Sequence, residues 1–182
     1  MYHMQEEIRQ RIQRSLGFGL VAAAVLVVDQ VSKAWVLGAL RPNPFRRLEI
    51  IPGFLRLQYA ENRGAAFSLF QNHPGILTAV AMILATAVLV WAVFFLPREE
   101  RLTRLALGLI FGGAVGNIID RLRFRYVLDF IEVYWRNVEF PPLIPWPRFN
   151  VADSSICIGI AAFFVASLLA ARGRPEKPDS IK

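Results

Sequence analysis

Four long apolar stretches separated by shorter polar segments dominate the hydrophobic pattern of the chain. They cover residues 16–40, 76–96, 102–119 and 155–171. A helix needs roughly 20 mostly apolar residues to cross the hydrocarbon core of a bilayer, and each stretch is close to that length. The pattern therefore predicts an all-α polytopic membrane protein, with four transmembrane helices in one membrane-embedded domain over residues 1–182.

Two long loops connect these stretches, one after the first and one after the third. Residues 41–75 begin with turns and continue, over 54–59, with alternating apolar and polar residues, which is typical of a β-strand. Residues 120–154 contain an apolar-aromatic stretch over 126–135, which predicts an amphipathic segment at the membrane surface, and a proline-rich run over 141–147. With four spans, both loops lie on one side of the membrane and both termini on the other.

Composition and charge support this interpretation and add an orientation. The hydrophobic share is 55%, above the ~45–50% of an ordinary soluble domain. The net charge is +7, and Lys and Arg lie most densely near the helix ends on the side of the termini, which favours cytoplasmic termini and extracytoplasmic loops. Arginines beside a bilayer pair with anionic headgroups, and no nucleic-acid-binding motif accompanies the charge. We therefore expect membrane lipids, and no nucleic acid, among the partners.

Cysteine and histidine are scarce, which narrows the chemistry. The single cysteine, Cys157, excludes an intrachain disulfide framework and a Cys-rich metal site. Its position within the fourth apolar stretch predicts a small core residue. The two histidines, His3 and His73, lie far apart in the sequence, so we expect neither a metal nor a cofactor. Carboxylates, amides and arginine remain as candidate chemical groups.

Polar residues in the first and third stretches form two clusters. Asp29 and Lys33 are four residues apart and share a helix face, either as a neutralised pair or as functional groups. Asn117, Asp120 and Arg121 share a face at the end of the third stretch, where the alternative is an Asp-Arg pair with an Asn that crosslinks helices. Glycines recur on that helix at four-residue intervals, which favours close packing of another helix: Gly108, Gly112 and Gly116.

Two further aspartates lie in the second long loop, on either side of the proline-rich run. Asp129 lies between large apolar residues, where burial would raise its pKa; taken alone, it would more often be an exposed acid on an interfacial segment. Asp153 follows Asn150 by three residues, which is also a helix-capping arrangement. Because both belong to one side of the membrane, the chain can bring them face to face. Such a pair shares a proton and can hydrolyse a peptide bond without metal, thiol or histidine.

Five motifs in this order give the chain a specific resemblance. They read DQVSK at 29–33, ENRGAAF at 61–67, GAVGNIIDR at 113–121, VLDF at 127–130 and FNVADS at 149–154. With these motifs at the ends of four spans, the chain resembles lipoprotein signal peptidase, also called signal peptidase II. The proline-rich run departs from the family pattern because it lengthens the connection between Asp129 and Asp153.

The resemblance implies an intramembrane aspartic endopeptidase of the bacterial cytoplasmic (inner) membrane. Its catalytic residues are Asp129 and Asp153, and it removes the signal peptide from diacylglyceryl-modified prolipoproteins by cleaving just before the lipid-bearing cysteine. Globomycin is the inhibitor that the family is known to bind. Other positions match residues that bind substrate or order the site, which are Asn62, Gly64, Asn117, Arg121 and Asn150, or residues of structural support, which are Asp29, Lys33 and Asp120.

Two other interpretations of the residues remain. A small four-helix proton-coupled transporter would use Asp29, Asp120 or Asp129 as a proton carrier, but it predicts a charge near mid-span and short loops. A non-catalytic assembly protein held by the glycine face would leave the paired aspartates unexplained. For the peptidase, we expect the strand-like loop with Asn62 to cover the site and the aromatic residues 130–135 to act as a movable lid.

Overall fold

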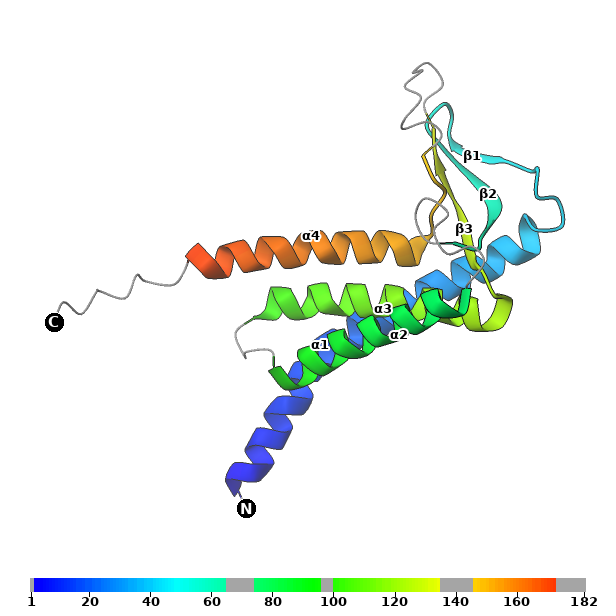
Figure 1. The fold of residues 1–182 in the computed structure, drawn as a ribbon. Helices are drawn as coiled ribbons and strands as arrows, with labels where there is room; N and C mark the ends of the chain where they lie inside the picture. Colours follow the sequence, from blue (N-terminus) through cyan, green and yellow to red (C-terminus); the bar gives the residue numbers. More distant parts are fainter. Residues whose placement is uncertain (1, 65–73, 96–99, 135–145, 173–182) are drawn as a thin grey trace.

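The computed structural model describes residues 2–64, 74–95, 100–134 and 146–172. The predicted four spans are confirmed: within these residues, four helices are long and apolar enough to cross a membrane, over Leu16–Ala39, Gly75–Phe95, Arg101–Phe124 and Val151–Ala171. They belong to α1 (Tyr2–Ala39), to α2 (Pro74–Val90) with the π-helical turn η2 (Trp91–Phe95), to α3 (Arg101–Phe124) and to α4 (Val151–Arg172). Figure 1 shows the N-terminal end of α1 and the C-terminal end of α4 together at one end of the helices.

The third and fourth helices extend beyond their predicted limits next to the sheet, in both cases across polar residues. The third, expected to end at residue 119, continues through Asp120 and Arg121 to Phe124, because Asp120 is neutralised by Lys33 inside the protein. The fourth, expected from residue 155, begins at Val151. Asp153 therefore lies in the first helical turn rather than ahead of the helix.

The third helix is the centre of the bundle. Just over half of its spanning segment is buried (56%), against 17–22% for the other three, and it packs against α1, α2 and α4. The predicted glycine packing is confirmed: a Cβ added at Gly112 would lie 2.6 Å from the carbonyl oxygen of Ala22 on α1. Gly113, next in sequence, approaches α4 equally closely at Ala152. Small residues on two faces thus let α3 contact two neighbouring backbones.

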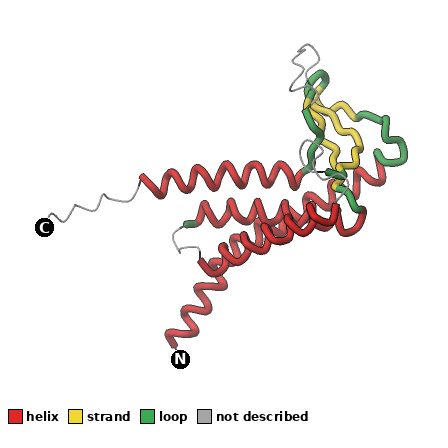
Figure 2. The backbone as a smooth tube through the Cα atoms, viewed as in Figure 1, coloured by secondary structure: helices red, strands yellow, loops and turns green. Residues whose placement is uncertain are grey.

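The two long loops form a single antiparallel sheet at the other end of the helices (Figure 2). Its strands lie in the order β1 (Leu48–Ile51), β2 (Leu55–Asn62) and β3 (Val127–Val133), and Phe149 pairs with Ile131 beside β3. The strand predicted over 54–59 is β2. The stretch over 126–135 was expected as an amphipathic surface segment, but its described part is mainly the strand β3, whose residues are mostly buried.

The sheet is held to the helices by an apolar cluster and a tight reversal. Val36 of α1 and Leu40, which follows it, pack against Leu128 and Phe130 of β3, together with two tyrosines in or next to the strands. Between α3 and β3, Arg125 adopts a left-handed backbone conformation with φ 68°, and its N–H donates to the carbonyl of Arg121. This turn reverses the chain, so Asp129 lies next to the helix that precedes it.

Candidate active site

Asp129 and Asp153 meet where the sheet joins the helices, and one asparagine contacts both. The Asn150 side-chain amide donates to Asp129 Oδ1 at 2.8 Å, while its backbone N–H donates to Asp153 Oδ2 at 3.2 Å. The other carboxylate oxygens accept from Asn62 Nδ2 (Asp129 Oδ2, 2.9 Å) and from Asn117 Nδ2 (Asp153 Oδ1, 2.8 Å). The sequence thus places three predicted residues, all asparagines, around this pair as neutral donors.

The electrostatics of the pair follow from burial without a counter-ion. Asp129 is 2% exposed, and no Lys or Arg nitrogen among the described residues lies within 4.0 Å of either carboxylate. Burial raises the pKa of Asp129 to about 7, with the charge of Asp153 as the second cause; hydrogen bonds from Asn62 and Asn150 act in the opposite direction. Asp129 is therefore a carboxyl group that holds a proton near neutral pH.

Asn150 lies directly before α4, where it caps the helix. The same residue therefore both caps the helix and places the two aspartates. Its Oδ1 accepts the backbone N–H of Asp153 at 2.8 Å, and Asp153 accepts the backbone N–H of Asn150 in return. This reciprocal pair satisfies donors that a helix start leaves unpaired. The capping interpretation of Asp153 is thus compatible with its place beside Asp129. Asn150 uses its Oδ1 for the cap and its side-chain nitrogen for Asp129.

A second buried cluster, centred on Lys33, lies next to the aspartate pair on the side of the helices. Lys33 Nζ is 2.9 Å from Asp29, 2.8 Å from Asp120 and 3.1 Å from Asn117 Oδ1. Asp29 Oδ1 accepts the backbone N–H of Ala152 at 3.0 Å, and Asp120 Oδ2 accepts that of Leu128 at 3.1 Å. The cluster therefore ties α1 and α3 to the two segments that carry Asp153 and Asp129.

The remaining predicted residues take up distinct places. Arg121 donates to the carbonyl of Asn117 at 3.4 Å and interacts electrostatically with Asp153, Asp129 and Asp120, in that order. The alternative of an Asp120–Arg121 ion pair is wrong, because Asp120 pairs with Lys33. Gly64 donates its N–H to Asn62 Oδ1 at 3.2 Å, which leaves the amide nitrogen of Asn62 directed at Asp129.

Several contributors were not identified from the sequence. Gln30 donates to Asp29 Oδ2 at 3.1 Å and to Asp120 Oδ1 at 3.3 Å; its place beside Asp29 was the available signal. Glu132, buried between Arg56 and Arg148, gave no signal because its partners are distant in sequence. Within the described residues, no group of three His, Cys, Asp or Glu side chains is placed to hold a metal ion.

Three expectations need correction or lie outside the described residues. Cys157 is exposed on α4 rather than part of the core, because it lies on a helix face that no other described element covers. Phe130 is 4% exposed inside a strand, so residues 130–133 are anchored and do not form a movable lid. The proline-rich run over 141–147 lies mostly outside the described residues.

Fold and site together define a class: a membrane-spanning enzyme with a buried carboxylate pair at the junction of a four-helix bundle and a small sheet. Residues 21–169 match the model of the family described as signal peptidase (SPase) II. The chain therefore belongs to the signal peptidase II family, a family of lipoprotein-processing peptidases, and the resemblance stated from its motifs is confirmed.

Relatives and solved structures agree with this assignment. The chain is 40% identical to a lipoprotein signal peptidase of Geobacter metallireducens over 79% of its length and 85% of the relative. It is 40% identical to one of Symbiobacterium thermophilum over 84% of its length and 95% of the relative. A solved bacterial membrane enzyme is similar with a TM-score of 0.73 and 28% identity, covering 90% of this chain and 93% of that one. A second has a TM-score of 0.69 and 29% identity, covering 82% and 90%.

Proposed function

We propose that the chain is an aspartic endopeptidase that removes the signal peptide from diacylglyceryl-modified prolipoproteins, cutting just before the lipid-bearing cysteine. Asp129 and Asp153 are its catalytic residues, and residues 1–182 act as one peptidase domain. The observation that carries the proposal is the carboxylate pair held by neutral amides, since a pair with no cation in direct contact can share one proton. Membership of a lipoprotein-processing family supports the substrate class.

In this mechanism Asp153 is the ionised partner and Asp129 the protonated one. Asp153 lies in the first turn of α4, where the helix N-terminus favours a negative charge, whereas the pKa of Asp129 is raised to about 7 by its burial. Asp153 takes a proton from water as the hydroxide adds to the scissile carbonyl carbon. Asp129 donates its proton to the carbonyl oxygen, which gives a neutral gem-diol.

Collapse of the gem-diol completes the hydrolysis. The carbon–nitrogen bond breaks as Asp153 gives its proton to the leaving amine of the cysteine, and one diol hydroxyl returns a proton to Asp129. The products are a signal peptide with a free carboxyl group and a lipoprotein with a free amine. Asn62, Asn117, Asn150 and Arg121 orient the two carboxylates and bind the substrate backbone, while Asp29, Lys33 and Asp120 support the site from below.

Location follows from the same proposal. The protein lies in the bacterial inner membrane with cytoplasmic termini, so the sheet and the aspartate pair face the extracytoplasmic side, where lipid-modified substrates reach them sideways from the bilayer. Reporter fusions after Asn72, Glu99, Asn137 and Lys182 should then alternate out, in, out and in. Any other order would contradict the orientation.

Cleavage of a defined substrate tests the activity. Purified protein in detergent is mixed with a diacylated prolipoprotein, and the products are analysed by mass spectrometry. We expect a cut directly before the lipid-bearing cysteine, no cut in the same precursor without lipid, and inhibition by globomycin. Metal chelators and thiol reagents should leave the rate unchanged, since the proposed chemistry uses neither group. Loss of activity with a chelator would overturn the aspartic mechanism.

The transporter is not favoured by any observation of the described residues. Asp29 and Asp120, two of its candidate proton carriers, are each ion-paired with Lys33 at 2.8–2.9 Å. The third, Asp129, lies on the sheet outside the spanning helices.

A further inference from the structure

A row of four charged side chains with alternating sign crosses the sheet. Its members are Glu49 of β1, Arg56 of β2, Glu132 of β3 and Arg148, which precedes α4. Glu49 and Arg56 are register partners, as are Arg56 and Glu132, and Arg148 Nε lies 3.3 Å from Glu132.

Glu132 is the buried centre of this charged row. It is 2% exposed, and it accepts two hydrogen bonds from Arg56, at 2.9 and 2.8 Å, and a longer one from Arg148. These contacts, with the Arg56 hydrogen bonds as the largest cause, lower the pKa of Glu132. A carboxylate held by two guanidinium groups across three chain segments fixes their spacing, because each bond is charge-assisted and directional.

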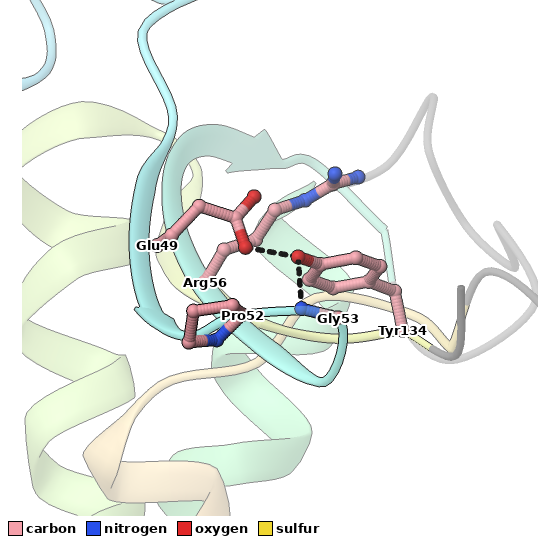
Figure 3. A pocket seen from close by; sticks show the side chains of 5 residues that line it. All are labelled: Glu49, Pro52, Gly53, Arg56 and Tyr134. Atoms are coloured by element: carbon pink, nitrogen blue, oxygen red, sulfur yellow. Dashed lines mark hydrogen bonds between the residues drawn. The ribbon is translucent and has the colours of Figure 1, made fainter.

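At its outer end, on β1, the charged row borders a small pocket, and the side chains there interact with one another (Figure 3). The Arg56 guanidinium lies 4.2 Å from the centre of the Tyr134 ring. The Tyr134 hydroxyl donates to Glu49 and accepts the backbone N–H of Gly53. Glu49 and Arg56 therefore both have partners in or next to the sheet. The inner end of the row is Arg148, which belongs to the segment before α4.

At the inner end of the row, Arg148 connects the sheet to the segment that continues into Asn150 and the aspartate pair. Arg148 contacts Glu132 and also donates to Gln58 Oε1 at 3.1 Å. The next residue, Phe149, exchanges backbone hydrogen bonds of 2.8 and 3.1 Å with Ile131. Asn150 follows at once, fully buried (0% exposed), with its amide 2.8 Å from Asp129. Within the described residues, the segment 146–149 is thus held to the sheet by the Phe149 backbone and by the Arg148 side chain.

We infer that Glu132 and Arg148 are positioning residues for the peptidase reaction, which fix the site of Asn150 between Asp129 and Asp153 by holding the segment before Asn150 to the sheet. The inference rests on the proposed function. Neither residue touches the aspartates. A displacement of about 1 Å at a site that must align two carboxylates and a water lowers turnover by up to roughly a hundredfold.

Kinetics of Glu132→Gln and Arg148→Gln test the inference on the diacylated prolipoprotein. We expect kcat to fall by roughly ten- to a hundredfold in each, with KM nearly unchanged, because neither residue contacts substrate. The double variant should be hardly slower than either single one, since the two act as a unit. Arg148→Lys, which keeps the charge, should recover most of the rate.

The pH profile separates positioning from mere loss of stability. The hydrogen bond from Asn150 lowers the pKa of Asp129, so a displaced Asn150 should move the alkaline limb of kcat/KM to higher pH. The other charged groups that act on Asp129 are Asp153 of α4, Lys33 of α1 and Arg121 of α3, and none of them is changed. Glu49→Gln, at the outer end of the row, is the matched control. It should leave both kcat and the pH of the alkaline limb unchanged.

The outcomes are distinct. Rates within twofold of wild type and an unmoved limb in folded Glu132→Gln or Arg148→Gln would overturn the inference, as would an increase in KM alone. If Glu132→Gln does not fold, Arg148→Gln carries the test, since that side chain is 34% exposed and Arg56 still neutralises Glu132. An inactive wild type would instead contradict the proposed function, whereas a Glu49→Gln control as slow as the other two variants would overturn the inference.

Discussion

Two pairs of aspartates lie next to each other in this molecule and differ in the groups that contact their carboxylates. Asp29 and Asp120, 0% and 1% exposed, share the ammonium group of Lys33. Asp129 and Asp153 share only the amide and backbone groups of Asn150. Asn117 joins the two pairs, since its Oδ1 accepts from Lys33 and its Nδ2 donates to Asp153.

Burial alone therefore does not decide what a carboxylate does. Lys33 lies 2.8–2.9 Å from both carboxylates of Asp29 and Asp120, the lower pair, and its removal would leave uncompensated charge inside the protein. Amide donors satisfy the oxygens of Asp129 and Asp153, the upper pair, without supplying a positive charge. Such an environment suits two carboxylates that share one proton. Under the proposed function, the lower pair serves structure and the upper pair transfers protons. Four experiments, in order of expected effect, sharpen or break this contrast.

Removal of the titratable group from the upper pair should have the largest effect. Asp129→Asn and Asp153→Asn keep shape and most hydrogen bonds, so each variant should fold and still bind substrate while kcat falls by about 10³-fold or more. The double variant should be hardly worse than either single one. If Asp153 served only as a cap, Asp153→Asn would cost at most about 1 kcal/mol of stability and little activity.

The matched control takes its aspartate from the lower pair. Asp29→Asn should lower the melting temperature and yield more than the turnover per folded molecule. The assignment of the catalytic pair is wrong if either upper variant keeps more than about a tenth of the wild-type rate, which corresponds to only ~1.4 kcal/mol in the barrier.

Removal of the cation from the lower pair should cost stability. Lys33→Met leaves Asp29 and Asp120 buried without a counter-ion, and breaking such a cluster costs about 3–5 kcal/mol. Thermal unfolding in detergent measures the loss. Adding Asp29→Asn and Asp120→Asn to Lys33→Met should recover part of it, because no uncompensated charge remains. A melting temperature of Lys33→Met equal to that of wild type would refute the structural assignment of this cluster.

Crowding of the lower pair should have a smaller effect. A Cβ at Gly116 would lie 2.5 Å from Asp29 Oδ2, so Gly116→Ala should push the carboxylate from Lys33 and destabilise the protein by about 1–3 kcal/mol. Gly19→Ala on α1 is the control: nothing lies within 4 Å of its added Cβ, and the helix should gain up to about 1 kcal/mol. Equal melting temperatures for the two variants would contradict the packing.

The pH dependence should show the smallest effect. The pKa of Asp129 is raised to about 7 by burial, so its proton is present below that pH and lost above it. The rate should therefore decline on the alkaline side, with a midpoint near 7. Asn62→Ala removes a hydrogen bond that lowers this pKa, which should move the decline to higher pH. A rate that rises steadily between pH 7 and 9 would exclude Asp129 as the protonated partner.

The sequence by itself determined the features that depend on local composition. Four apolar stretches are long enough to cross a bilayer whatever packs against them, so their number was predictable. The glycine spacing on α3 identified its packing face, because periodicity is a property of one helix. The motifs identified both aspartates and the three asparagines that contact them, and the alternation over 54–59 identified β2.

Only the tertiary structure decided which polar groups are partners. Asp120 was as close in sequence to Arg121 as any pair can be, yet it binds Lys33 from another helix, because burial selects the cation that can reach it inside the bundle. The stretch around Asp129 became a strand rather than a surface segment because β2 offered a pairing edge. Glu132 and Arg148 had no sequence signal, since a cross-strand contact depends on register. Sequence patterns record what one segment prefers, and the partners of a buried charge are set by segments far away in the chain.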